Sequence, residues 1–297
     1  METGVLRDVV AYPVPVHRSW IRLRRLLLRR KLVVVALASI VFVVALALLA
    51  PWVAPHDPYN VDLAASLQDP SARHWLGTDQ LGRDVLSRLI FGARVALLVG
   101  VVTVSVSCLV GSLLGLAAGY FGRLADNLIM RTIEALMSLP PLVLALAIGV
   151  AMGGGLETVI IALSVAMIPA YTRLLRGQVM AVKHMDYVTA AVASGASDFR
   201  IMFLHVLPNC LSPLIVEASI GLGFAILAES ALSFLGLGVA PPQPSWGEMI
   251  SDGYRYLRTH PLLSIAPGLC ISLLVLACNI IGDTARDVFD PRLRQGL

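Results

Sequence analysis

The feature that most constrains this chain is an uncharged, apolar run of 19 residues, Leu32 to Ala50. A helix of about 20 apolar residues crosses the ~30 Å hydrocarbon layer of a bilayer. Five more apolar stretches follow, at about residues 95–119, 127–152, 157–176, 212–236 and 262–282. A chain that is 57% hydrophobic and 14% charged cannot cover a soluble core with a polar surface. The sequence therefore predicts an all-α, polytopic membrane protein with six transmembrane helices.

The basic residues predict how these spans are oriented. Six spans place both termini on one side, and that side would carry 17 Lys and Arg residues against 6 on the other. By the positive-inside rule, both termini are predicted to be cytoplasmic, with residues 1–31 as a basic cytoplasmic segment. No small-residue cleavage site precedes the first run, which favours an uncleaved span over a signal peptide. The net charge of +4 thus sets topology and contacts lipid headgroups, and nucleic-acid binding is not expected.

The cysteines and histidines give no metal-binding pattern. Four cysteines lie in or beside apolar stretches without a CxxC motif, and we expect them to be small buried hydrophobic residues. The six histidines are scattered and form no HExxH motif, so no metal site is predicted. His56 and His74 share a polar loop, which leaves a metal site there as the alternative.

The first span is followed by a proline-punctuated loop over residues 51–91. We expect residues 32–91 to form the first transmembrane helix and an extracytoplasmic loop, and residues 92–297 to form the transmembrane core. From Asp84 the loop becomes helical in pattern. An amphipathic helix that lies at the outer membrane interface and leads into the second span is expected there.

Two spans contain residues that predict local geometry. Gly111, Gly115 and Gly119 recur every four residues, so they line one helical face and predict close packing against another helix. Pro140 and Pro141 interrupt the third apolar stretch, and a kink is expected because the helix loses backbone donors there.

Polar side chains in the last two spans have two interpretations. Glu217 and Glu229 lie in the fifth span and Asn279 in the sixth. A carboxylate inside a membrane is costly and usually faces a cavity or a partner group. These three residues either line a polar pathway or make satisfied hydrogen bonds within the bundle.

The segment 186–208 is predicted to lie in the cytoplasm, between the fourth and fifth spans. Its apolar residues recur with a helical period, Gly195 predicts a bend, Ser197 is available as an N-cap, and Pro208 is expected to end the second helix. Small side chains such as Thr189 and Ala190 suit insertion into a cleft of another protein. A helix resting on lipid would instead favour basic residues and bulky anchors.

Any ATP-driven work must be done by another chain. A P-loop requires Gly-Lys-Ser/Thr, and this chain has only two lysines, Lys31 and Lys183, neither in that context. If nucleotide hydrolysis drives the protein, the ATPase would contact residues 186–208 and transmit its motion through them.

The same segment resembles the permease subunits of binding-protein-dependent ABC importers. Their cytoplasmic signature is E-A-A, three residues, Gly, nine residues, I-x-L-P. Here it stands as Thr189-Ala190-Ala191, Gly195, His205 and Leu207-Pro208, with Thr in place of Glu and His in place of Ile. The C-type subunits of the dipeptide, oligopeptide and nickel branch are resembled by LGTDQLGRDVLSRLIFGAR (76–94), ESALSFLGLGVAPPQPSWGEMISDG (229–253) and IIGDTARDVFDPRLR (280–294).

The resemblance implies a non-catalytic subunit with the type I ABC importer permease fold in a bacterial plasma (inner) membrane. Its implied partners are a homologous second permease subunit, two ATPase subunits that bind ATP and Mg, and an extracytoplasmic solute-binding protein. No cofactor is expected in this chain. The implied cargo is a di- or oligopeptide, with glutathione, a nickel chelate or another small solute as alternatives.

The resemblance also assigns residues to roles. The coupling loop spans about 177–211, and the residues expected to contact the ATPase are Asp186, Tyr187, Thr189, Ala190, Ala191, Gly195, Ala196, Ser197, Asp198 and Pro208. The proline-rich loop at 238–262 is predicted to lie outside, where a binding protein would contact Pro241, Pro242 and Trp246. Prolines stiffen such an edge at low entropic cost; an ordinary structural turn is the alternative.

Two other protein classes fit less well. An ion-coupled secondary transporter could use Glu229 as a proton relay, but it has no use for a docking segment at 186–208. An intramembrane hydrolase would need a nucleophile motif, and no GxSxG sequence or Asp pair lies at bilayer depth.

Overall fold

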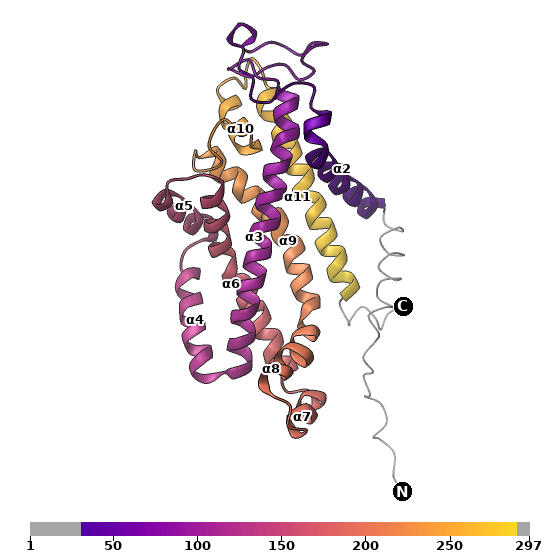
Figure 1. Ribbon diagram of the computed structural model, residues 1–297, viewed down its shortest axis with the longest axis vertical. Coiled ribbons are helices and arrows are strands. Elements are labelled where there is room, and N and C mark those ends of the chain that lie inside the picture. The colour runs from indigo at the N-terminus through magenta and orange to yellow at the C-terminus, as the bar shows by residue number, and fades with distance from the viewer. Residues whose placement is uncertain (1–30, 290–297) are drawn as a thin grey trace.

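The structure is a computed structural model, and it describes residues 31–289. The basic segment predicted over residues 1–31 lies outside the described residues except for Lys31, as does the C-terminal segment from residue 290. Within residues 31–289 the regular structure is helical, apart from one isolated bridge between Thr78 and Asp84. The long helices run along the long axis of the molecule (Figure 1).

Five helical runs are long and apolar enough to cross a membrane, and a bent pair makes a sixth if it is counted as one span. The five runs are α2 (Lys31–Val53), α3 (Val85–Phe121), α6 (Leu156–Val182), α11 (Leu262–Phe289), and the continuous stretch from Asp198 to Phe234 that holds α8 (Asp198–Arg200), η2 (Ile201–Val206) and α9 (Leu207–Phe234). The predicted all-α architecture with six spans is confirmed on this count.

The bent pair is α4 (Arg123–Met137) and α5 (Pro141–Met152), whose axes differ by 85°. Its break lies at the predicted position, because Pro140 adopts an extended conformation and neither Pro140 nor Pro141 has an N–H to continue the helix. The third stretch is therefore broken rather than gently kinked. Figure 1 shows α5 lying across the direction of α4.

The predicted glycine face lies in the contact between α3 and α6, the most extensive helix contact among the described residues. A Cβ atom on Gly111 would lie 2.6 Å from Cβ of Tyr171, and one on Gly115 would lie 2.5 Å from the carbonyl oxygen of Thr172. Only glycine allows the two backbones to approach this closely. The repeat thus fixes α3 against α6.

The start of α3 differs from the expected interfacial helix. α3 runs unbroken from Val85, and Val85, Ser87 and Arg88 are buried. Asp84 caps the helix by accepting the backbone N–H of Ser87 at 2.8 Å. The face of the first turn that we expected to meet lipid is covered by protein, including α10 (Trp246–Tyr254), whose Trp246 indole reaches Leu89.

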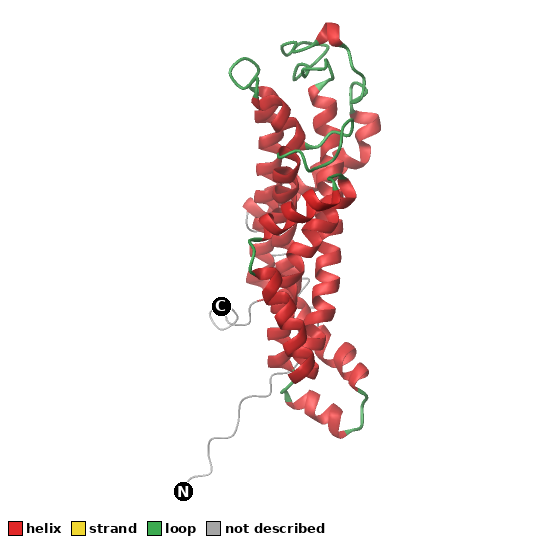
Figure 2. Cartoon of the chain, turned by 90° about the vertical axis from the view of Figure 1, so that its left-hand side faces the viewer, coloured by secondary structure: helices red, strands yellow, loops and turns green. Residues whose placement is uncertain are grey.

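The loop segments gather at two opposite ends of the bundle. At one end lie residues 54–84, with the short helix η1 (Leu63–Ala65), and α10; at the other end lies α7 (Asp186–Ala193), between α6 and α8 (Figures 1 and 2). The predicted docking segment and the predicted binding-protein loop are therefore separated by the length of the bundle.

Candidate coupling site

The short helix α7 is attached to the bundle by one face. Val188 is 2% exposed and packs in a cluster with Leu116, Val179 and Ile201, against which Ala191 and Ala196 also pack. These partners lie near the ends of α3 and α6 and in η2. The attachment face of α7 thus packs against η2 and shares one buried cluster with the ends of α3 and α6.

The bend after α7 is a helix C-cap whose backbone conformation favours glycine. Gly195 has φ +76°, in the left-handed region, and its N–H donates to the carbonyl of Val192 at 3.0 Å. The N–H of Ala196 donates to the carbonyl of Ala191 at 3.2 Å, which completes a Schellman motif. No heavy atom lies within 4 Å of a Cβ placed on Gly195, so its backbone conformation, not crowding, selects glycine.

The segment after the bend is tied to α3. Ser197 caps α8, as predicted, by accepting the N–H of Arg200 at 3.4 Å. The Tyr120 hydroxyl donates to Oδ1 of Asp198 at 2.7 Å, and the Lys183 ammonium donates to the Tyr120 carbonyl. Sequence reasoning placed Asp198 in the site but missed Tyr120, because the contact joins residues 78 apart.

The opposite face of α7 is uncovered. Asp186, Tyr187, Thr189 and Ala190 are exposed, and the Thr189 hydroxyl donates back to the Met185 carbonyl within the helix at 3.4 Å. Partial burial raises the pKa of the Tyr187 phenol, so this hydroxyl stays neutral. The exposed face therefore offers small and neutral groups, with Asp186 as its charge.

Pro208 does not end a helix, which corrects the prediction from sequence. The chain continues through Pro208 into α9 because η2 is a π-helical turn, in which Leu207 N–H donates to Met202. The wider turn accommodates a residue without an N–H. The Asn209 side chain donates to the His205 carbonyl at 2.7 Å.

The predicted pathway residues do not form one group. Glu229 is 0% exposed and accepts hydrogen bonds from the hydroxyls of Ser233 at 2.7 Å and Ser230 at 3.3 Å. Glu217 is half-buried and lies about 18 Å away along the axis of α9. Asn279 is half-buried on α11. In this conformation Glu229 has the geometry of a satisfied packing group.

The proline-rich loop has an exposed part and a buried part. Pro241 and Pro242 are exposed, whereas Trp246 is 2% exposed and its indole N–H donates to the Leu89 carbonyl at 2.9 Å. Trp246 therefore cannot itself offer a surface to a partner, and the predicted contact stays with the two prolines.

A buried ion-pair network under this loop was missed in the sequence. Arg88 is 1% exposed, with Nη2 3.2 Å from Oε2 of Glu248 and Nε 3.5 Å from Oδ2 of Asp79. Arg83 Nε lies 2.6 Å from the same Asp79 oxygen. Burial raises the pKa of Glu248, and the neighbouring Arg88 opposes that shift. The charged residues of LGTDQLGRDVLSR were the sequence signal for such a network. Their partner Glu248 on α10, however, is 160 residues away from Arg88.

Comparison with curated proteins finds relatives along nearly the whole chain. The di/tripeptide transport system permease protein DppC of Pseudomonas aeruginosa (strain UCBPP-PA14) is 44% identical over 96% of this chain and 95% of its own. The glutathione transport system permease protein GsiD of Pectobacterium atrosepticum is 39% identical over 94% and 93%. The dipeptide transport system permease protein DppC of Alkalihalophilus pseudofirmus is 39% identical over 93% and 90%.

Among solved structures, the MetNI methionine ABC transporter in inward-facing conformations is similar in fold. It matches with a TM-score of 0.54 and 21% identity, over 68% of this chain and 97% of the matched one. Residues 18–70 match the N-terminal TM domain of oligopeptide transport permease C. Residues 111–295 match the binding-protein-dependent transport system inner membrane component. The resemblance to ABC importer permeases is thereby confirmed, and the chain belongs to the family of binding-protein-dependent transport system inner membrane components.

Proposed function

We propose that this chain forms half of the translocation pathway of a bacterial ABC importer for di- and tripeptides and receives force from separate ATPase subunits through α7. The observation that carries the coupling role is the geometry of α7. One face is anchored through Val188 to the ends of α3 and α6, and the other exposes Thr189 and Ala190 at the tip of the bundle. A face with small side chains at Thr189 and Ala190 and one charge at Asp186 fits a cleft in another subunit.

The contacts around α7 supply a path for force. When ATP closes the ATPase pair, the clefts move α7 and α8. The Tyr120–Asp198 hydrogen bond passes this displacement to α3, and the hydrogen bond from Lys183 to the Tyr120 carbonyl joins α3 to the end of α6. ATP and Mg are held by the ATPase subunits, and this chain performs no chemistry. The spans then alternate between inward-facing and outward-facing arrangements.

The two ends of the bundle would then lie on opposite sides of the membrane. The basic residues favour a cytoplasmic α7 and cytoplasmic termini in a plasma (inner) membrane. The opposite end, with exposed Pro241 and Pro242, would then face an extracytoplasmic solute-binding protein. A homologous second permease subunit completes the pathway.

The cargo is inferred from relatives of similar identity. Two of these relatives are named as dipeptide or di/tripeptide transport proteins, and a third is named as a glutathione transport protein. Glutathione is itself a tripeptide derivative. We therefore propose short peptides, with glutathione as the second candidate. Competition between labelled dipeptide and glutathione in uptake by the assembled importer decides between them.

Substitution of Gly195 tests the coupling role. Valine is strained at φ +76°, at a cost of roughly 1–2 kcal/mol or more, whereas asparagine visits this region readily. In proteoliposomes containing all subunits, we expect Gly195→Val to lower ATP-driven peptide uptake about tenfold, while Gly195→Asn stays near wild type. Equal uptake by both variants would refute the coupling role. Ion-driven uptake by the chain alone would indicate a secondary transporter.

A further inference from the structure

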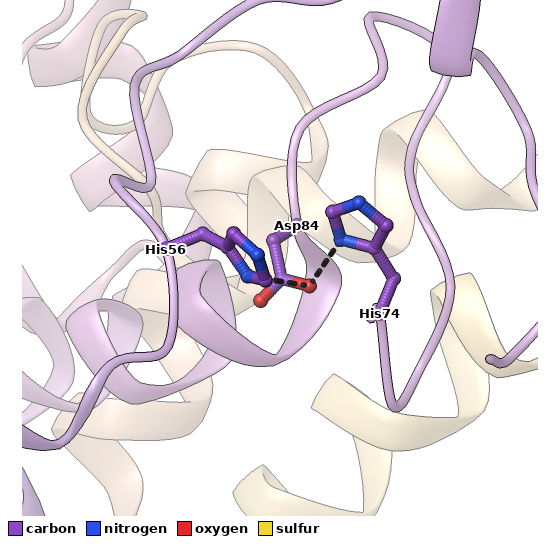
Figure 3. A group of neighbouring side chains, drawn as sticks. All are labelled: His56, His74 and Asp84. Carbon is purple, nitrogen blue, oxygen red and sulfur yellow. Dashed lines mark hydrogen bonds and ion pairs between the residues drawn. The ribbon is translucent and has the colours of Figure 1, made fainter. Parts of the chain in front are cut away.

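We propose that His56, His74 and Asp84 bind one divalent transition-metal ion of the zinc type. The two histidines lie in the loop 54–84, with His56 just after α2 and His74 farther along, and Asp84 caps α3. Figure 3 shows both imidazole rings turned toward the Asp84 carboxylate. The proposal concerns the end of the bundle opposite α7 and does not depend on which solute is carried.

The distances suit a four-coordinate ion. Oδ1 of Asp84 lies 2.9 Å from Nδ1 of His74 and 3.7 Å from Nδ1 of His56, and one ligand atom from each residue falls within 4.8 Å of the others. Bonds of about 2.0–2.1 Å at a tetrahedral zinc place neighbouring ligand atoms about 3.3–3.4 Å apart. The two measured distances lie on either side of this value, so each of these two pairs needs a shift of about half an ångström or less to reach the zinc geometry.

Two of the three ligand atoms, Nδ1 of His74 and Oδ1 of Asp84, share a hydrogen bond of 2.9 Å, and a bound ion would replace the proton between them. The other carboxylate oxygen of Asp84, Oδ2, accepts the N–H and hydroxyl of Ser87, which leaves Oδ1 directed at the two rings. Nδ1 of His56 is buried and has no hydrogen-bond partner among the described residues. A buried polar atom without a partner is costly, and coordination to a metal ion would remove that cost.

The surrounding hydrogen bonds hold the site in place before any ion arrives. The backbone N–H of His56 donates to the Ser87 hydroxyl at 3.0 Å, and that of His74 donates to the Ser71 hydroxyl at 3.1 Å. Ser87 thus positions both Asp84 and His56. Such outer contacts orient metal ligands and raise affinity.

The donor set selects the class of ion. Two imidazoles and one carboxylate suit zinc and its transition-metal neighbours, whereas calcium and magnesium prefer oxygen ligands. The Asp84 side chain is 1% exposed and that of His56 is 33% exposed, so the ion can enter beside His56. Once bound, it would fasten the loop 54–84 to the start of α3.

Zinc titration of the assembled importer tests this site. The full-length chain, purified with its partner subunits in detergent and stripped with a chelator, is titrated with ZnCl₂ against a chromophoric zinc chelator. We compare wild type with His56→Ala, with Asp84→Asn, and with His260→Ala as a control histidine in another loop. Asp84→Asn keeps an N-cap acceptor for Ser87 but loses the ligand charge.

We expect wild type and His260→Ala to bind one more zinc per importer than His56→Ala, or to bind that zinc at least about tenfold more tightly. Asp84→Asn should show the same loss of zinc binding. In the absence of metal, this variant should unfold at a temperature close to that of wild type. Cobalt should give the visible absorption of a tetrahedral site in wild type and in His260→Ala, but in neither ligand variant. Equal zinc stoichiometry and affinity in wild type and both ligand variants would overturn the proposal.

Discussion

Replacing Gly115 with alanine should destabilise the contact between α3 and α6. The new Cβ would lie 2.5 Å from the carbonyl oxygen of Thr172, 3.0 Å from the Arg176 nitrogen and 3.1 Å from Cβ of Leu175. Carbon atoms at optimal contact lie about 3.5–4.0 Å from their neighbours. The closest two atoms belong to the α6 backbone, so no side-chain rotation relieves the clash and the helices must separate.

The size of the effect follows from two opposing terms. Overpacking a tight contact costs about 1–3 kcal/mol, and backbone neighbours place Gly115 near the upper end. Alanine is a better helix former than glycine by about 1 kcal/mol, which offsets part of this cost. We therefore expect a net loss of about 2 kcal/mol.

Gly177 provides a matched control on α6. No heavy atom lies within 4 Å of a Cβ placed there, so Gly177→Ala should gain up to about 1 kcal/mol. Thermal unfolding in detergent is followed with a thiol-reactive dye, whose signal rises as the buried Cys210 and Cys278 become exposed. Gly115→Ala should lower the midpoint by roughly 4–8 °C, at about 2–4 °C per kcal/mol for a chain of this size. A midpoint at or above wild type would refute the close-contact reasoning.

Three further experiments test other parts of the structure. Trp246→Ala should cost about 3–5 kcal/mol in the same unfolding assay, because it removes a fully buried indole and its hydrogen bond; a loss below 1 kcal/mol would contradict its packing role. Glu229→Gln should keep uptake near wild type, since an amide oxygen can still accept from Ser233; a large loss would assign Glu229 to the pathway. A double-mutant cycle on Arg176 and Asp126 should give a coupling energy near 1 kcal/mol, at the upper end for partly exposed pairs, because Nε and Nη2 of Arg176 each donate to one carboxylate oxygen; a value near zero would contradict this geometry.

The features that sequence predicted correctly are set by local chemistry. The length of an apolar run decides whether a helix spans a membrane, and Leu32–Ala50 falls within α2. Glycines spaced by four share a helix face whatever they contact, so Gly111, Gly115 and Gly119 predicted a close partner. The bend at Gly195 is also local, because its hydrogen bonds lie within five residues.

The features that sequence missed depend on residues far apart in the chain. Arg88 pairs with Glu248 on α10, and Trp246 is buried over the same part of α3, so neither partner was visible in a local pattern. Pro208 was misjudged because the π-helical turn that accommodates it has no short sequence signature. His56 and His74 share a loop, but only the fold brings them to Asp84.

The two ends of the molecule are joined mechanically by α3. This helix of 37 residues spans about 55 Å and begins beside Arg88 and Asp84, while its last turn carries Tyr120 beside Asp198. The glycine face fixes its second half against α6, so these two helices should move as one body. A push on α7 would then reach the loop 54–84 as a displacement of α3 instead of being absorbed by bending. The buried network and the proposed ion at that loop would therefore move with the start of α3.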